Sequence, residues 1–136
     1  MNMDRFKQDH VAVLSSISEL RRLIQAGITE NSGSIAKTIV SMSSAIKLHL
    51  AAEDRMLYPK LEQSTYPGAA DIGQKFQTEM GSIASAYMEF TRKWAFGPKI
   101  VANPDGFKVD ANNIYKALFQ RIQREDKELY PIAANV

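Results

Sequence analysis

Apolar side chains recur at intervals of three and four residues in four stretches of the chain, and none shows the alternation typical of strands. Because such intervals place apolar residues on one face of a helix, each stretch predicts an amphipathic helix. The predicted helices run from Phe6 to Ile24, from Ser34 to Leu57, from Ile72 to Trp94 and from Ile114 to Leu129. Gly27 follows the first stretch, where a left-handed cap would end the helix.

The segments between these stretches contain residues that break helices. A residue before proline disfavours helical backbone, so we expect the second helix to stop before Pro59 and the fourth before Pro131. The cluster at residues 64–68 separates the second and third helices, and a Gly-Pro pair at residues 97–98 ends the third. Residues Lys99 to Asp110, which include an Asn-Pro-Asp-Gly run, predict a long connection before the fourth helix.

The chain also contains an internal repeat. The run from Glu53 to Pro59 returns 72 residues later, with small changes, as the run from Glu125 to Pro131. Further upstream, Phe6 to His10 matches Phe76 to Met80, which lies 70 residues later, in its aromatic residue, its acid and its spacing. Two diverged helical hairpins with slightly different loops would produce these two offsets.

These patterns predict an all-α fold, in which four antiparallel helices form an up-down-up-down four-helix bundle. We expect a single domain covering residues 1–136 and built from two helical hairpins, at about 3–62 and 70–132. An apolar content of 45% in 136 residues is enough to enclose one sizeable core without a required partner. Inward positions of such a bundle are available to hold a ligand between the helices.

Composition and charge argue against several kinds of partner and chemistry. The chain has no cysteine, which removes disulfides, thiolate metal sites and cysteine nucleophiles and fits a cytoplasmic location. Its 17 basic and 15 acidic side chains leave a formal charge of +2, and the basic residues are scattered, so we expect no nucleic-acid partner. No apolar run approaches the length of a membrane span and no signal-peptide pattern is visible, so we expect no membrane association.

The apolar stripes are interrupted at similar depths by residues of another kind: His10, His49 with Glu53, Met80, and Arg121 with Glu125. A buried carboxylate without a partner costs several kcal/mol, so Glu53 and Glu125 require a metal, a cation or a proton beside them. His49 and Glu53, four residues apart on one helix face, would aim a nitrogen and an oxygen at a common point, and His10 would add a third donor. Two imidazoles and one carboxylate suit zinc or non-haem iron with open positions.

With these residues in place, nearly the whole chain resembles the haemerythrin-like domain family, also called the HHE cation-binding domain. The resemblance rests on His10, on His49 and Glu53 followed by Asp54-x-x-Leu57-Tyr58-Pro59, and on the degenerate repeat. It implies a four-helix bundle that holds two non-haem irons through histidines of all four helices and bridging carboxylates. Members of that family bind dioxygen, sense it or store iron.

The resemblance also implies which residues of this chain would bind metal. Carried over by position, His10, His49 and Glu53 match ligand sites of the family. Glu125 or its neighbour Asp126 matches the second bridging carboxylate.

The chain departs from the family pattern in its second half, because the histidines of the third and fourth helices fall on Met80 and Arg121. A thioether is a poor donor for non-haem iron, and a guanidinium cannot ligate, so a normal diiron centre is not expected. Met80 is expected to fill the core. Arg121 offers the charge that a metal would supply, and it could pair with Glu125 on its own helix or with Glu53.

Two functional hypotheses remain open. The first is a degenerate site that binds one iron or zinc ion and serves dioxygen or redox sensing or iron handling, with His10, His49, Glu53 and either Glu125 or Asp126 as ligands. The second is a metal-free bundle that acts as a regulatory or interaction module, in which Arg121 neutralises the interior carboxylates. No particular protein partner is indicated.

An enzymatic function, such as a peroxidase-like or oxygenase-like activity, is less favoured, because the sequence contains no distinct acid, base or substrate pocket. No glycine-rich phosphate loop or nucleophile motif occurs either. Tyr58 and Tyr130 each precede a proline, and we expect packed rings whose hydroxyl groups reach solvent or a backbone group.

Overall fold

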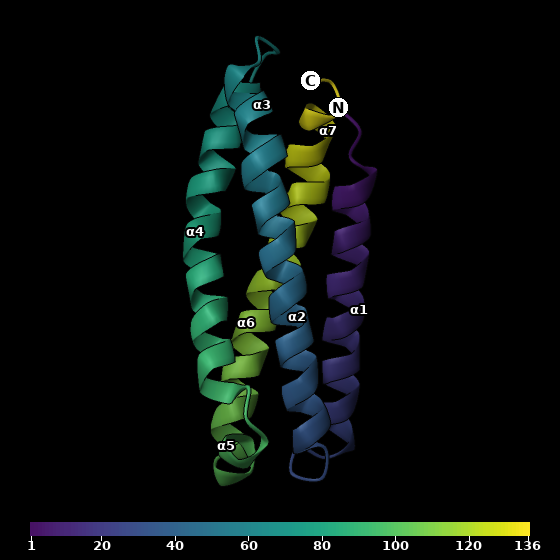
Figure 1. Cartoon of the computed structure of the whole chain (residues 1–136), viewed down its shortest axis with the longest axis vertical. Coiled ribbons are helices and arrows are strands. Elements are labelled where there is room, and N and C mark those ends of the chain that lie inside the picture. The colour runs from purple at the N-terminus through teal and green to yellow at the C-terminus, as the bar shows by residue number, and fades with distance from the viewer.

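The four amphipathic stretches form four long helical rods that lie side by side and alternate in direction (Figure 1). The computed structural model describes all 136 residues and contains no strand. The first rod is α1 (Asp4–Ala26) and the third is α4 (Ala69–Trp94). The second rod joins α2 (Ser32–Ala52), a π-helical segment η1 (Glu53–Leu57) and α3 (Tyr58–Gln63). The predicted all-α, up-down-up-down bundle is thereby confirmed.

The fourth rod has the same composite build as the second. It joins α6 (Pro104–Arg124), the π-helical segment η2 (Glu125–Leu129) and α7 (Tyr130–Ala133). A short helix, α5 (Gly97–Ala102), crosses the end of the bundle before it. Both chain termini lie together at the opposite end (Figure 1). None of the helices is both long and apolar enough to cross a membrane.

The expectation that the second and fourth helices stop before Pro59 and Pro131 is wrong, because both rods continue through the proline. In each rod the turn before the proline is widened. The amide of Tyr58 donates a hydrogen bond to the carbonyl of Glu53, five residues earlier. The corresponding bond from Tyr130 to the carbonyl of Glu125 is indeed present. A proline lacks an N–H and crowds the carbonyl four residues earlier, so a widened turn accommodates it without ending the rod.

The long connection expected from Lys99 to Asp110 is also wrong, because this stretch is mostly helical. Asn103 caps α6, and its side-chain oxygen accepts a hydrogen bond of 3.0 Å from the amide of Gly106. Pro104 occupies the first turn, where a missing N–H is harmless. The same residues that suggest a loop therefore form a helix start. Gly27 does end α1 as predicted, with a φ of 131°.

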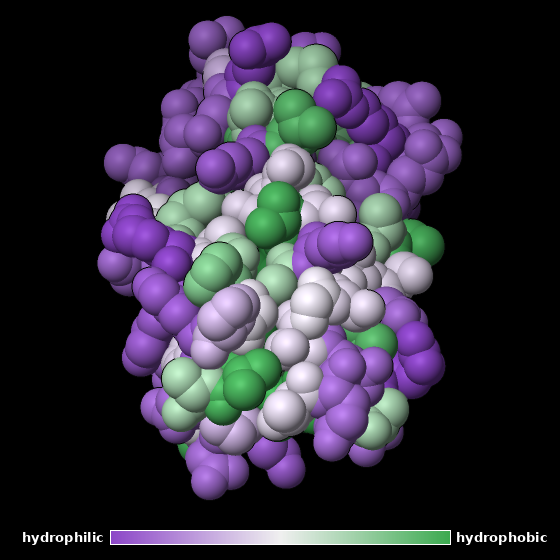
Figure 2. Space-filling model, turned by 60° about the horizontal axis from the view of Figure 1, so that its bottom comes forward, coloured by the Kyte–Doolittle hydropathy of each residue, from purple (hydrophilic) through white to green (hydrophobic).

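Buried apolar side chains form two clusters that lie at different heights in the bundle. The larger cluster includes Val13, Ile46 and Leu118, and the smaller one includes Phe6 and Leu129. Along α1, His10 lies between Phe6 of the smaller cluster and Val13 of the larger one. A layer of buried polar side chains therefore separates the two clusters. On the outside, Figure 2 shows hydrophobic residues interspersed with hydrophilic ones on the face that carries the α5 end of the bundle.

Candidate metal centre

The polar layer contains the charged residues that interrupt the apolar stripes: His10 of α1, His49 of α2, Glu53 of η1, Arg121 of α6 and Glu125 of η2. All five are buried, and Glu53 and Glu125 are 0% and 2% exposed. The two acids therefore point into the bundle and not into water. Buried carboxylates of this kind need neighbours that carry positive charge or donate protons.

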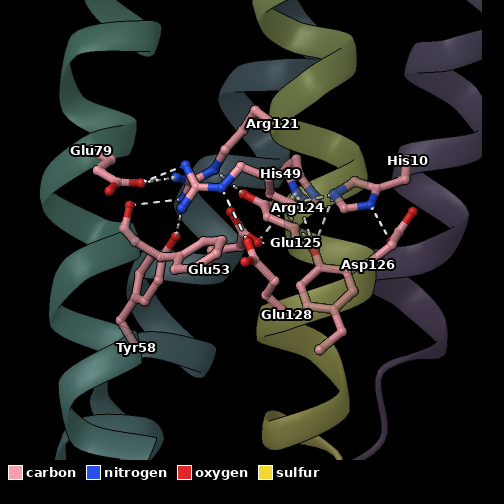
Figure 3. Close-up of polar contacts among 12 residues, drawn as sticks. His10, His49, Glu53, Tyr58, Glu79, Arg121, Arg124, Glu125, Asp126 and Glu128 are labelled. Carbon is pink, nitrogen blue, oxygen red and sulfur yellow. Dashed lines mark hydrogen bonds and ion pairs between the residues drawn. The ribbon is translucent and has the colours of Figure 1, made fainter.

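Two histidines and Glu125 converge on one point between α1, α2 and η2 (Figure 3). Nε2 of His10 lies 2.8 Å from Oε1 of Glu125, and Nε2 of His49 lies 3.6 Å from the same oxygen. Nε2 of His49 is also 3.4 Å from Oε2 of Glu53. The ligand atoms of His10, His49 and Glu125 all lie within 4.8 Å of one another.

Two further carboxylates bind the outer nitrogens of the imidazole rings. Asp126 lies 2.8 Å from Nδ1 of His10, and Asp9 lies 2.9 Å from Nδ1 of His49. These contacts direct both Nε2 atoms inward, in the way that outer carboxylates orient histidine ligands in metal sites. Asp126, which the sequence offers as an alternative to Glu125, therefore lies on the far side of His10 from the point of convergence. Sequence reasoning missed Asp9, although it immediately precedes His10.

The hydroxyl of Tyr130 lies among these groups, contrary to the expectation that it would reach solvent or backbone. It is 2.9 Å from Oε2 of Glu53 and 3.2 Å from Oε1 of Glu125. It is also 3.0 Å from Nε2 of His10 and 3.4 Å from Nε2 of His49. In a regular α-helix, residues five apart are separated by about 140° around the axis, so helical periodicity would not place Tyr130 beside Glu125. The π segment η2 brings both to one face.

Arg121 fills the other half of the polar layer. Its Nε donates a hydrogen bond of 2.8 Å to Oε2 of Glu125, and one Nη donates at 2.8 Å to the carbonyl of Phe76. The same nitrogen lies 3.3 Å from the hydroxyl of Tyr58, and the guanidinium stacks over the Phe76 ring. The hydroxyl of Tyr58 therefore also lies inside the bundle. The expected pairing of Arg121 with Glu125 is present, but Arg121 forms no ion pair with Glu53.

Glu79 extends the Arg121 side of the polar layer toward the surface (Figure 3). One of its oxygens lies 3.6 Å from Nη1 of Arg121 and accepts a hydrogen bond of 2.8 Å from Arg124. Met80 lies one residue further along α4 and lines a small cavity of about 30 Å³, whose polar walls are His10, His49, Arg121 and Glu125 and whose other walls are apolar. Met80 is thus a core residue, and it offers only a weak sulfur donor to the site.

The two halves of the layer are related by the internal repeat. His49 faces Glu53 four residues on, and Arg121 faces Glu125 four residues on, at corresponding places of the two composite rods. Tyr130 meets the histidines, and Tyr58 meets the guanidinium. The first hairpin therefore contributes both histidines, and the second contributes Arg121 together with Glu125, which contacts both His10 and Arg121.

The buried charges shift one another's pKa values. Burial lowers the pKa of His49, but the carboxylates of Glu125 and Glu53 outweigh that effect and raise it to about 10. Burial also lowers the pKa of His10, and Glu125 more than reverses this, so the pKa is raised as well. Burial alone would raise the pKa of Glu125, yet His10 and His49 hold it well below its usual range. Without a bound ion, the imidazolium groups of His10 and His49 and the guanidinium of Arg121 neutralise the buried carboxylate of Glu125.

The residues present fit one metal ion on the histidine side of the layer. Two imidazole nitrogens and a carboxylate oxygen are a donor set that suits iron(II) or zinc. Oε1 of Glu53 is buried and has no hydrogen-bond partner, so a further oxygen donor is available close by. On the opposite side, Arg121 offers only donors of hydrogen bonds and cannot bind a metal.

The family model described as Hemerythrin HHE cation binding domain matches residues 1–133. No curated protein and no solved structure matches the chain.

Proposed function

The chain belongs to the hemerythrin HHE cation-binding family, and from this premise we propose that it binds one non-haem iron or zinc ion through His10, His49 and Glu125. Glu53 would add an oxygen ligand from η1. Asp9 and Asp126 would hold the two imidazole rings in orientation from outside. The observation that carries this proposal is the convergence of the three ligand atoms within 4.8 Å inside the bundle.

The proposed centre is mononuclear because the second half of the layer already contains a cation. Arg121 is 3% exposed and forms a hydrogen bond of 2.8 Å with Glu125. A second ion placed there would meet the guanidinium at close range without a histidine to bind it. Glu125 would therefore use one oxygen for the metal and the other for Arg121.

The surroundings of the site support a role in binding or sensing a small ligand such as dioxygen, or in handling iron. The cavity beside His10 and His49 has a volume of about 30 Å³, and its other walls include Val13, Ile46 and Leu118. A space of this size suits a diatomic molecule or one water and excludes an organic substrate. Such a site fits a carrier or sensor better than an enzyme with a large substrate.

Metal retention tests the proposal directly. We expect purified protein given iron(II) without oxygen, and then desalted, to retain about one equivalent per chain by elemental analysis. His49→Ala removes a central ligand and should abolish retention. Glu62→Ala, which removes an exposed carboxylate of α3, serves as the control and should retain the ion. Equal retention by His49→Ala and the wild type would contradict the proposal.

A second candidate function is a metal-free regulatory or interaction module, and the buried Arg121–Glu125 ion pair favours it. In this case the negative charges of the polar layer are balanced by Arg121 and the histidines, and no metal ion is needed. Addition of a chelator to the iron-loaded protein distinguishes the two functions. The melting temperature should fall only if the protein had bound metal.

A further inference from the structure

The hydroxyl of Tyr130 has more polar neighbours than a phenol can satisfy. It is 1% exposed as a residue and lies within 3.4 Å of His10, His49, Glu53 and Glu125. A phenol has one proton to donate and a limited capacity to accept. A single positive ion that replaces the phenol proton would instead be shared by the oxygen and all of its neighbours.

The separations around this hydroxyl match those between ligands of one metal ion. Ligand atoms roughly 2.1 Å from an ion are about 3.4 Å apart in a tetrahedral site and about 3.0 Å apart in an octahedral one. The Tyr130 oxygen lies 3.0 Å from Nε2 of His10, 3.2 Å from Oε1 of Glu125 and 3.4 Å from Nε2 of His49. The phenol is therefore spaced as a member of the ligand set.

The ring of Tyr130 is also held in place by its surroundings. It stacks on the ring of His10, with ring centroids 5.0 Å apart and an angle of 16° between the planes. Phe6 packs against it from the neighbouring helix, with centroids 6.0 Å apart. A ligand that is already oriented loses little conformational freedom when the ion binds.

The repeat provides an internal comparison. Tyr58 occupies the matching place after η1, yet its hydroxyl contacts Arg121 at 3.3 Å and meets no histidine. The half of the layer without histidines thus uses the same residue as an ordinary hydrogen-bonding group. Only Tyr130 faces the residues that converge on the metal position.

We propose that Tyr130 is a ligand of the bound iron and coordinates it through the phenolate oxygen. The hydroxyl proton is released to solvent when the ion binds, as with other ligands that must deprotonate. Phenolate is a hard oxygen donor that favours iron(III), so this ligand would stabilise the oxidised ion. This inference rests on the proposed function, since it requires an ion at His10, His49 and Glu125.

Optical spectroscopy of the iron-loaded protein tests this ligand. Protein loaded with iron(II) without oxygen, oxidised with ferricyanide and desalted should show a phenolate-to-iron(III) charge-transfer band in visible light, with phenolate modes in resonance Raman spectra. Tyr130→Phe should lose the band and these modes. Tyr58→Phe is the matched control and should keep both.

The outcomes separate this inference from the metal proposal itself. Iron retained by the wild type without the band or the phenolate modes would overturn the role of Tyr130 and leave the metal site intact. Wild-type protein that retains no iron would overturn the metal site. Should Tyr130→Phe fail to fold, the assignment is decided by Tyr58→Phe: a band that persists supports Tyr130, and a band that disappears overturns it.

Discussion

At the scale of single residues, Glu125 joins the two halves of the polar layer. Its Oε1 faces His10 and its Oε2 accepts a hydrogen bond from Arg121, both at 2.8 Å. Removal of either partner would leave one oxygen of this buried carboxylate without its hydrogen bond and would lower the stability of the fold. The structure therefore gives Arg121 a structural role that holds whether or not an ion is bound.

We expect Arg121→Ala to destabilise the metal-free protein by on the order of 3 kcal/mol, because it leaves a buried carboxylate with less compensation and empties the space around Phe76. Urea unfolding followed by circular dichroism would measure this change. Arg22→Ala is the control, since Arg22 forms an exposed pair with Glu19 on one helix and should change stability by less than about 1 kcal/mol. Equal stability of Arg121→Ala and the wild type would contradict the role assigned to this ion pair.

At the scale of secondary-structure elements, local signals identified the helices but misjudged where two of them begin or end. Pro59 and Pro131 indicate helix ends in the sequence, and the widened turns η1 and η2 carry both rods past them. Asn103 and Pro104 indicate a loop, and they in fact start α6. Proline and asparagine are common both in loops and at the first positions of helices, so composition alone does not separate these cases.

The cap at Asn103 can be tested by substitution. Asn103→Ala removes the side-chain acceptor for the amide of Gly106 and should cost about 1 kcal/mol. Asn112→Ala, at an exposed position inside α6, is the matched control and should be neutral or slightly stabilising, because alanine favours helices. Thermal unfolding of both variants would measure the difference. No loss of stability in Asn103→Ala would contradict the capping role.

At the scale of the whole molecule, the fold is two related hairpins whose polar residues have diverged. Corresponding places carry His10 and Met80, and likewise His49 and Arg121. The bundle brings both sets into one layer between two apolar clusters, where they share Glu125. The second hairpin therefore lacks the two histidines of the first but keeps Glu125, which meets those histidines across the bundle.

This relationship predicts that a second metal ion can be bound on the Arg121 side of the polar layer once histidines are introduced there. Met80→His with Arg121→His should raise retained iron(II) from about one to about two equivalents per chain, because both missing imidazoles are then supplied. Elemental analysis after desalting would measure the stoichiometry. The double variant Met80→Leu with Arg121→Leu removes the same side chains without adding donors and should show no gain. One equivalent in the histidine variant would show that the two halves are not equivalent in geometry.

The sequence by itself determined the helical bundle, the repeat and the inward direction of Glu53 and Glu125, because these follow from periodicity along single helices. Only the tertiary structure decided which carboxylate faces which cation. It placed Nε2 of His10 against Glu125 and Asp126 behind His10, and it brought the hydroxyl of Tyr130 inside. These contacts join different helices or depend on a widened turn, and neither is encoded in the spacing of residues along a regular helix.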